Sequence, residues 1–281
     1  MNKKLIIIPL VTVAIIVLTV GYFLWANQRA DYYADVSRET NDKQTEILAL
    51  EKSVELYPKP DNIISLADLY VSIGRDDLAE KIMVGRPVLM SFLRGRGEVQ
   101  ILNRLGNLYL DENKTQDAEN VFTKAKNKDL NPDSLKGLVL SQLQKGDRGE
   151  AENYLSQLSA LDSDSSNCYA AFVYLNNFKK AENAFGKVKD CNIFGIDKYF
   201  AKRKDTQSPL YLKLEAANFY YEHNYLQLAL NDTLALEREK DNYRDAYILG
   251  SKIYEKIGDQ SKASEQGKKA VEIDPALNLM N

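Results

Sequence analysis

The feature that most constrains this chain is a pattern of small and aromatic residues that recurs about every 34 residues. In one copy, Gly106 is followed by Tyr109 and then by Asn113 and Ala118. A period of this length indicates an array of stacked two-helix units rather than one globular core. Another copy keeps the same residue types at the same spacing: Ala67, Tyr70, Gly74 and Ala79.

Each residue type in the pattern has a physical reason. A small residue lets the two helices of a unit approach closely, and an aromatic residue fills the space to the next unit. Glycine or asparagine is suited to a left-handed turn between the helices. One unit alone would leave an apolar face in water, so neighbouring units must stack. We therefore expect an all-α chain.

The pattern resembles the tetratricopeptide repeat, a helix–turn–helix unit of 34 residues. The resemblance implies a right-handed α-solenoid of about six to seven repeats over residues 27–281. Two stretches, 86–98 and 190–208, interrupt the tiling and are expected to form longer loops or short extra helices. The alternative is a related helical array with a longer period, which fits this spacing less well. The clearest copies begin near Pro60, Val99, Leu210 and Arg244, and degenerate copies begin near residues 27, 132 and 162.

An apolar run without charge covers residues 5–26. As a helix it is about 33 Å long, enough to cross the hydrocarbon core of a bilayer. A cleaved signal peptide would have a shorter apolar region and would end in a cleavage site of small residues. Here Leu24-Trp25-Ala26 precedes the first polar residues, and these three residues make a poor cleavage site. No cysteine follows the run, which argues against a lipoprotein anchor. We predict an uncleaved transmembrane signal anchor after a short head of residues 1–4.

The charges beside the run favour one orientation only weakly. Lys3 and Lys4 lie in the head, while Arg29, Arg38 and Lys43 lie on the long side among several acidic residues. A short polar head is rarely translocated, so we expect a cytoplasmic N-terminus and an extracytoplasmic solenoid. The alternative is the opposite topology, that of an import receptor facing the cytosol from an organelle.

The composition argues against nucleic-acid binding and against catalysis. The chain has 37 basic and 40 acidic side chains, which does not give the basic surface that phosphate binding needs. His223 is the only histidine and there are two cysteines, so no metal cluster or nucleophile–histidine set can be argued from the sequence. We therefore predict a protein that is not an enzyme and that uses no cofactor or metal.

In tetratricopeptide proteins the first helix of each repeat lines a concave groove. For this chain, the resemblance implies that the groove holds a protein or peptide. The clamp that some of these proteins use for acidic chaperone tails is absent, because Gly137 stands where an asparagine is expected and Ser163 where a base is expected. The residues expected on the inner surface are Asn103, Asn107, Lys136, Leu140, Leu143, Tyr174, Tyr211, Leu214, Asn218, Tyr221, Ile248 and Lys252.

Cys168 and Cys191 bracket the degenerate repeat that begins near residue 162. An extracytoplasmic solenoid would permit a disulfide between them. A regular repeat would leave the two cysteines offset along the helix axes, so the bond requires an irregular helix. The alternative is a pair of separate thiols, one buried and one exposed.

Together these features favour a membrane-tethered scaffold that recruits or organises proteins in a cell-envelope complex. The rival hypothesis is an ancillary chaperone of secretion beside the Sec translocon. The two differ in their ligands, because a scaffold holds one folded partner and a chaperone holds many unfolded clients.

Overall fold

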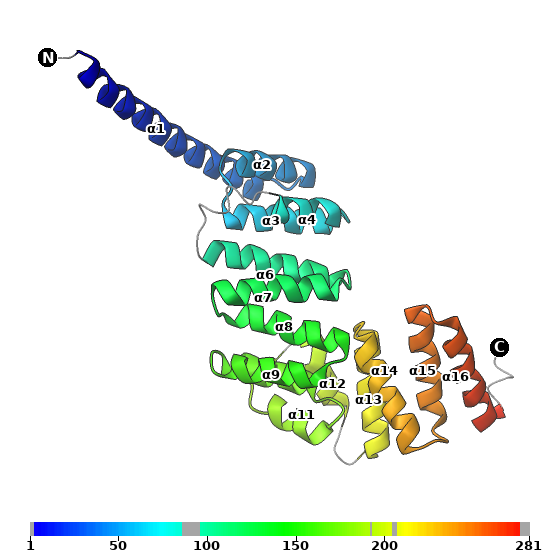
Figure 1. Ribbon diagram of the computed structural model, residues 1–281. Coiled ribbons are helices and arrows are strands. Elements are labelled where there is room, and N and C mark those ends of the chain that lie inside the picture. The colour runs from blue at the N-terminus through cyan, green and yellow to red at the C-terminus, as the bar shows by residue number, and fades with distance from the viewer. Residues whose placement is uncertain (1–2, 86–95, 192, 204–206, 276–281) are drawn as a thin grey trace. The chain divides into compact units, whose positions relative to one another are not determined.

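The computed structural model describes residues 3–85, 96–191, 193–203 and 207–275, and the side chains of the first helix from Thr12 onward. All regular secondary structure in these residues is helical, which confirms the predicted all-α class. Consecutive helices joined by turns follow one another along the chain, as expected for a tetratricopeptide-like α-solenoid (Figure 1). The chain divides into two compact units, residues 1–108 and 109–281.

The first unit begins with a long helix, α1 (Lys3–Glu39), that continues past the apolar run without a break. The C-terminal part of α1 packs against α2 (Lys43–Leu56) and so supplies the first helix of the first hairpin. The approach is close because the buried positions of α1 are small: Ala26, Ala30 and Ala34 are 0%, 0% and 2% exposed. The remaining helices of this unit are α3 (Pro60–Ser72), α4 (Asp76–Val84) and α6 (Arg96–Asp111), which extends past the unit boundary.

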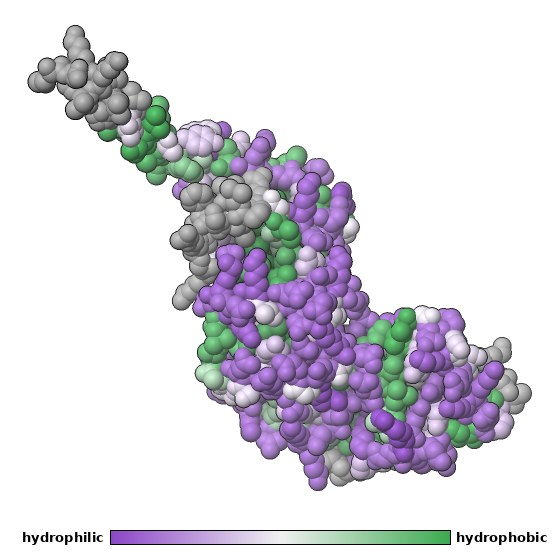
Figure 2. All heavy atoms as spheres, in the orientation of Figure 1, coloured by the Kyte–Doolittle hydropathy of each residue, from purple (hydrophilic) through white to green (hydrophobic). Residues whose placement is uncertain are grey.

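The part of α1 that precedes Ala26 is not packed against the rest of its unit. The side chains from Thr12 to Trp25 are all exposed, and they include Val17 at 63% and Leu18 at 74%. Figure 2 shows hydrophobic residues on this part of the helix. Among the described residues, α1 is the helix whose length and composition would allow it to cross a membrane.

The second unit consists of α7 (Thr115–Lys128) and the hairpins that follow it. An irregular segment separates two of these hairpins, and its described residues include the 3-10 helix η1 (Ile193–Gly195) and α12 (Ile196–Lys202). The hairpins are α8 (Pro132–Lys145) with α9 (Arg148–Ser159), α10 (Ser163–Val173) with α11 (Phe178–Phe185), α13 (Pro209–Glu222) with α14 (Leu226–Glu239), and α15 (Arg244–Ile257) with α16 (Gln260–Ile273).

Most hairpin turns use a left-handed residue where the repeat pattern has glycine or asparagine. This conformation is easy for glycine and tolerated by asparagine, which explains the residue types. The hairpin of α10 and α11 differs, because Asn176 is not among the positive-φ residues. Its helix α11 begins after Asn177, whose Oδ1 accepts a hydrogen bond from the Lys180 amide at 3.2 Å. The left-handed turn residues, with their φ values, are Gly74 (71°), Asn113 (59°), Gly146 (79°), Asn224 (65°) and Gly258 (93°).

Helix α14 packs against α8, although hairpin α10–α11 and the irregular segment separate them in sequence. Arg148 joins these parts of the second unit. Its Nη1 and Nη2 donate to the two carboxylate oxygens of Asp232 on α14, at 3.0 and 2.9 Å. Its Nε donates to the Val173 carbonyl at the end of α10, at 2.9 Å. The guanidinium is therefore satisfied on all three nitrogens by two different elements.

Tyr220 on α13 completes this junction. Its hydroxyl lies 2.5 Å from the Phe172 carbonyl and 3.1 Å from the Val173 carbonyl, and its side chain is fully buried. Burial raises the pKa of Tyr220, so the hydroxyl stays protonated and can donate. Burial alone would lower the pKa of Arg148, but the hydrogen bond with Asp232 and the nearby negative charge hold it above its ordinary value. We call Arg148, Asp232 and Tyr220 the interhelix junction.

We predict that Asp232→Ala lowers the stability of the second unit by about 3 kcal/mol, because it leaves a largely buried guanidinium without its anion. In a unit of this size that corresponds to a fall in Tm of roughly 6–12 °C, which thermal circular dichroism would measure. The matched control is Lys262→Ala, which removes one partner of an exposed ion pair and should cost less than about 1 kcal/mol. The double change Arg148→Met with Asp232→Leu should recover part of the loss, and no recovery would contradict this account.

Candidate protein-binding surface

The predicted inner-surface residues lie on the first helices of their hairpins, or at the end of one in the case of Tyr174. They fall into both units. In the first unit, Asn107 on α6 is exposed, whereas Asn103 is 9% exposed and offers little area to a partner. In the second unit, Leu143 is buried and Tyr211 and Lys252 are exposed, while the other predicted residues are half-buried.

The α8 residues do not form an open wall. Leu143 is 0% exposed, so the expectation that it lies on an accessible surface is wrong. Leu140 is half-buried and packs against the core that α10, α13 and α14 share. Leu143 itself belongs to the hydrophobic core that α8 shares with α9, α10, α13 and α14. Lys136 is engaged locally, with its Nζ 3.3 Å from Asp133 and 3.9 Å from Asp162.

Tyr174 is half-buried and lies beside helices α9 and α11. Its ring lies under the ammonium of Lys180 on α11, 3.4 Å from the ring centre. It also lines a shallow recess with Glu152 and Ser156 of α9.

Four of the predicted residues lie on one face of α13. Tyr211, Leu214, Asn218 and Tyr221 are three or four residues apart and so occupy one face of α13. Tyr211 is 41% exposed and the other three are half-buried. Helix α13 contacts α15, which carries the predicted residues Ile248 and Lys252. We call the set Tyr211, Leu214, Asn218, Tyr221, Ile248 and Lys252 the α13–α15 surface.

One end of the α13–α15 surface is held by a contact between the two helices. Near the C-terminal end of α13, Lys256 Nζ lies 3.5 Å from the Tyr221 carbonyl oxygen and 4.9 Å from the centre of the Tyr221 ring. At the other end, Tyr243 lies just before α15, and burial raises its pKa. In the middle, Asn218 Nδ2 donates to Glu222 at 2.7 Å. The surface thus presents aromatic, amide and ammonium groups on a rigid pair of helices.

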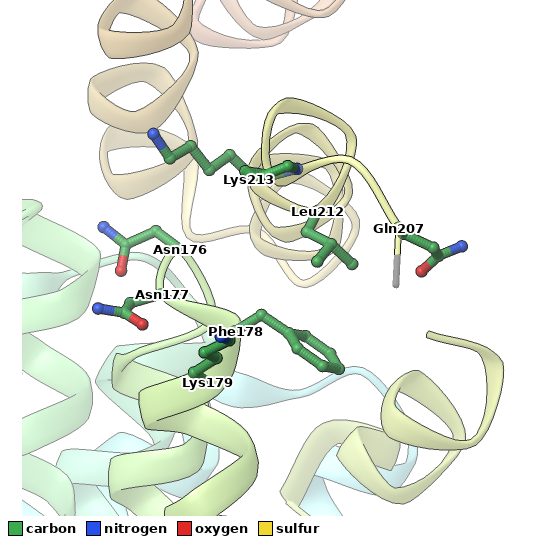
Figure 3. Close-up of a pocket in the computed structure, with 8 residues that line it drawn as sticks. Asn176, Asn177, Phe178, Lys179, Gln207, Leu212 and Lys213 are labelled. Carbon is green, nitrogen blue, oxygen red and sulfur yellow. The ribbon is translucent and has the colours of Figure 1, made fainter. Parts of the chain in front are cut away.

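A pocket of about 320 Å³ opens at the N-terminal end of α13. Phe178 from α11 and Leu212 from α13 point toward one another across it (Figure 3), and both are largely buried. Sequence reasoning missed this pocket because it forms where the chain leaves the repeat pattern between α11 and α13. The lining residues are Asn176, Asn177, Phe178, Lys179, Gln207, Pro209, Leu212 and Lys213.

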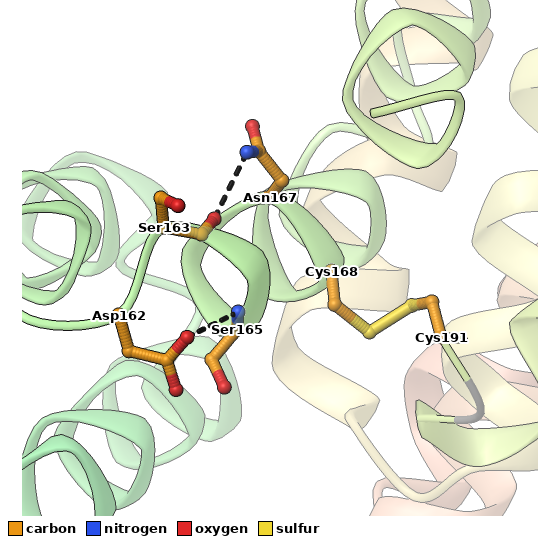
Figure 4. Close-up of a disulfide and its surroundings, with 6 residues drawn as sticks. All are labelled: Asp162, Ser163, Ser165, Asn167, Cys168 and Cys191. Atoms are coloured by element: carbon orange, nitrogen blue, oxygen red, sulfur yellow. Dashed lines mark hydrogen bonds between the residues drawn. A yellow bond between two sulfur atoms is a disulfide. The ribbon is translucent and has the colours of Figure 1, made fainter. Parts of the chain in front are cut away.

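In the structure Cys168 and Cys191 are joined by a disulfide, with their Cα atoms 5.4 Å apart (Figure 4). Helix α11 is short and ends at Phe185, so the chain reaches Cys191 through a loop rather than along a regular helix. This irregularity removes the axial offset expected for a regular repeat. Both cysteines are buried, at 9% and 6% exposure.

His223 has a structural environment. It follows α13 at the turn, and its Nδ1 lies 2.8 Å from the Phe219 carbonyl oxygen. Its ring packs against those of Phe219 and Phe194, with centroids 4.3 and 5.6 Å away. Over the residues that the structure describes, no group of three or more His, Cys, Asp or Glu side chains is placed to hold a metal ion.

Two segments of the sequence, residues 99–127 and 245–277, match the family model of the tetratricopeptide repeat. The chain carries tetratricopeptide repeats. The first match covers most of α6 and α7, and the second covers α15 and α16. Tetratricopeptide repeats are protein-interaction modules, so the helices described above belong to a class of scaffold that binds other proteins.

Solved structures of other tetratricopeptide proteins are similar to this chain at low identity. A tetratricopeptide repeat protein from Parabacteroides merdae is 15% identical, with 88% of this chain and 94% of that chain covered and a TM-score of 0.49. The pilF protein of Pseudomonas aeruginosa is 16% identical, covers 89% and 94%, and has a TM-score of 0.41. YrrB, described as having an unusual peptide-binding site, is 17% identical, covers 81% and 93%, and has a TM-score of 0.35. A search of curated protein sequences found no match.

We predict that loss of the disulfide destabilises the second unit by about 3 kcal/mol. The bond lowers the conformational entropy of the unfolded chain by closing a loop in it, and this entropy is regained when the bond is lost. Cys191→Ser should therefore lower the Tm by roughly 6–12 °C, measured by thermal circular dichroism without reductant. The control is the addition of reductant. It should leave the Tm of the variant unchanged and should lower the Tm of the wild-type chain to the value of the variant. An unchanged Tm in the variant would show that the bond contributes nothing.

Proposed function

We propose that this protein is a single-pass membrane protein whose tetratricopeptide repeats hold a partner protein within a cell-envelope complex. The observation that carries the proposal is the α13–α15 surface, a row of aromatic, amide and apolar side chains on stacked first helices. The partner is a protein segment, because these side chains match peptide chemistry and the chain as a whole is slightly acidic, with a net charge of −3.

The exposed apolar part of α1 supports the membrane anchor. Each large apolar side chain left in water costs on the order of 1.5–3 kcal/mol relative to an apolar environment, and α1 exposes many of them between Val13 and Trp25. No other described part of the first unit covers them. A bilayer would, and Tyr22 and Trp25 lie at the end of the run, where interfacial aromatic residues are common.

The proposed orientation places the N-terminal head in the cytoplasm and the repeats outside it. The pairing of Cys168 with Cys191 supports this orientation, because disulfides persist in oxidising compartments and are rare in the cytosol. The short head with Lys3 and Lys4 is consistent with it.

The α13–α15 surface has the composition of a recognition surface. Tyrosine offers a large contact area and a hydrogen bond at low entropic cost, and asparagine can pair with a peptide backbone. Leu214 and Tyr221 are half-buried between neighbours, so they are already ordered before a partner binds. An extended or helical peptide segment lying along α13 would contact side chains from both helices.

We predict that Tyr211→Ala together with Asn218→Ala weakens partner binding by at least about tenfold, because an aromatic anchor is lost. The partner is first identified by purifying tagged full-length protein from membranes in mild detergent, followed by mass spectrometry. Affinity is then measured for wild-type and variant proteins of equal Tm.

The matched control is Asn153→Ala with Tyr154→Ala, which removes the same residue types from the second helix α9. One or two near-stoichiometric partners that are lost with the first variant and kept with the control would support the proposal. Equal loss in both variants, or in neither, would contradict the assigned surface. Recovery of a broad set of secreted proteins together with translocon subunits would contradict the scaffold hypothesis and favour the chaperone of secretion.

A further inference from the structure

The first hairpin is built directly on the helix that carries the apolar run. Helix α1 has no break between Trp25, which is 52% exposed, and Ala26, which is fully buried. The change from exposed to packed therefore takes place within one residue. A continuous helix has no flexible linker, so the position of the hairpin follows from the position of the apolar run.

The corner between α2 and α3, residues 56–60, lies beside the first turns of α1 after the apolar run. Ser53 Oγ donates to the Ala30 carbonyl at 2.8 Å, near the end of α2. Lys59 Nζ, just before α3, lies 2.5 Å from an Asp31 carboxylate oxygen. Asn62 Nδ2 donates to Ser53 Oγ at 2.8 Å and ties α3 to the same place.

The opposite end of this hairpin is marked by a different contact. Lys43 Nζ, at the start of α2, lies 3.5 Å from Ser72 Oγ at the end of α3. Helix α3 spans about 18 Å between its ends, at 1.5 Å per residue. The N-terminal end of α3 is therefore closer to the apolar run than its C-terminal end. Ile73, which is 46% exposed, lies at the end farther from the apolar run.

Helix geometry sets the level of the corner. Ala30 is five residues beyond Trp25, a rise of about 7 Å along α1. The headgroup region on each side of a bilayer is roughly 5–8 Å thick. With the apolar run in the hydrocarbon core, the corner beside Ala30 falls in the headgroup layer.

The side chains at this level suit that layer. Tyr57 lies in the corner, with Lys59 Nζ 6.0 Å from its ring centre. On α1, the Arg29 guanidinium lies 5.1 Å from the Tyr32 ring centre and 5.5 Å from that of Tyr33. Tyrosine, lysine and arginine are the residues that combine an apolar body with a polar tip at membrane interfaces.

We propose that the corner of residues 56–60 rests in the phospholipid headgroup layer, so that the first hairpin is seated on the membrane by α1. This inference rests on the proposed membrane anchor. Its partner is the phospholipid surface itself, contacted by Tyr57 and Lys59 from the corner and by Arg29 from α1.

The test uses the full-length protein in liposomes that contain a phospholipid with a nitroxide on its headgroup. A thiol-reactive fluorophore is attached at Tyr57→Cys or, as matched control, at Ile73→Cys at the far end of α3. Wild-type protein is the labelling blank, because its two cysteines are joined. We expect quenching of the label at position 57 and none at position 73.

Intrinsic fluorescence separates failure of the anchor from failure of the inference. Trp25 is the only tryptophan, so it reports whether the apolar run enters the bilayer. Quenching of Trp25 without quenching at position 57 would contradict the proposed contact of the hairpin with the headgroup layer. The same result would still support the membrane anchor. No quenching of Trp25 would overturn the anchor and the inference with it.

A helical insertion tests whether α1 sets the depth. The segment Glu-Ala-Ala-Ala-Lys-Ala-Ala inserted between Trp25 and Ala26 would lengthen α1 by about 10 Å while nearly preserving its rotation. We expect the label at position 57 to lose its quenching while Trp25 remains quenched. Persistent quenching at position 57 would contradict control of the depth by α1.

Discussion

The arrangement of the second unit depends on the buried ion pair of Arg148 and Asp232, whose partners are 84 residues apart in the sequence. A guanidinium at this depth must have an anion and acceptors for its remaining donors, and α14 and the end of α10 provide them. The pairing therefore fixes hairpin α13–α14 against α8 and α10. Leu143 is buried in the core of this unit, while Tyr211 on α13 is exposed.

Much of the fold could be predicted from the sequence because it is encoded locally. Gly74, Asn113, Gly146, Asn224 and Gly258 adopt the left-handed turns that their spacing predicts, since each requirement concerns one residue and its neighbours. Buried Ala118 and Ala229 confirm the small positions of the pattern in the same way. Helix existence and hairpin order follow from such local rules.

The features that the sequence did not predict arise from contacts between distant segments or from departures from the repeat. Leu143 is buried in the core that the helices of the second unit share, and the ring of Tyr174 lies under the ammonium of Lys180. The pocket beside Phe178 forms at an irregular connection, where repeat spacing gives no register. Helix α1 also continues from the apolar run to Glu39 without a break, so the degenerate repeat predicted from about residue 27 begins within the same helix.

In the proposed topology, the apolar run of α1 spans the membrane, and the disulfide and the α13–α15 surface lie outside the cytoplasm. The most direct test is protease protection in intact spheroplasts that express the chain with a C-terminal tag. The account predicts that added protease removes the tag and digests the repeats, leaving a short membrane-protected fragment that contains the apolar run. A tag that stays protected until the membrane is permeabilised would place the repeats in the cytoplasm and contradict the account.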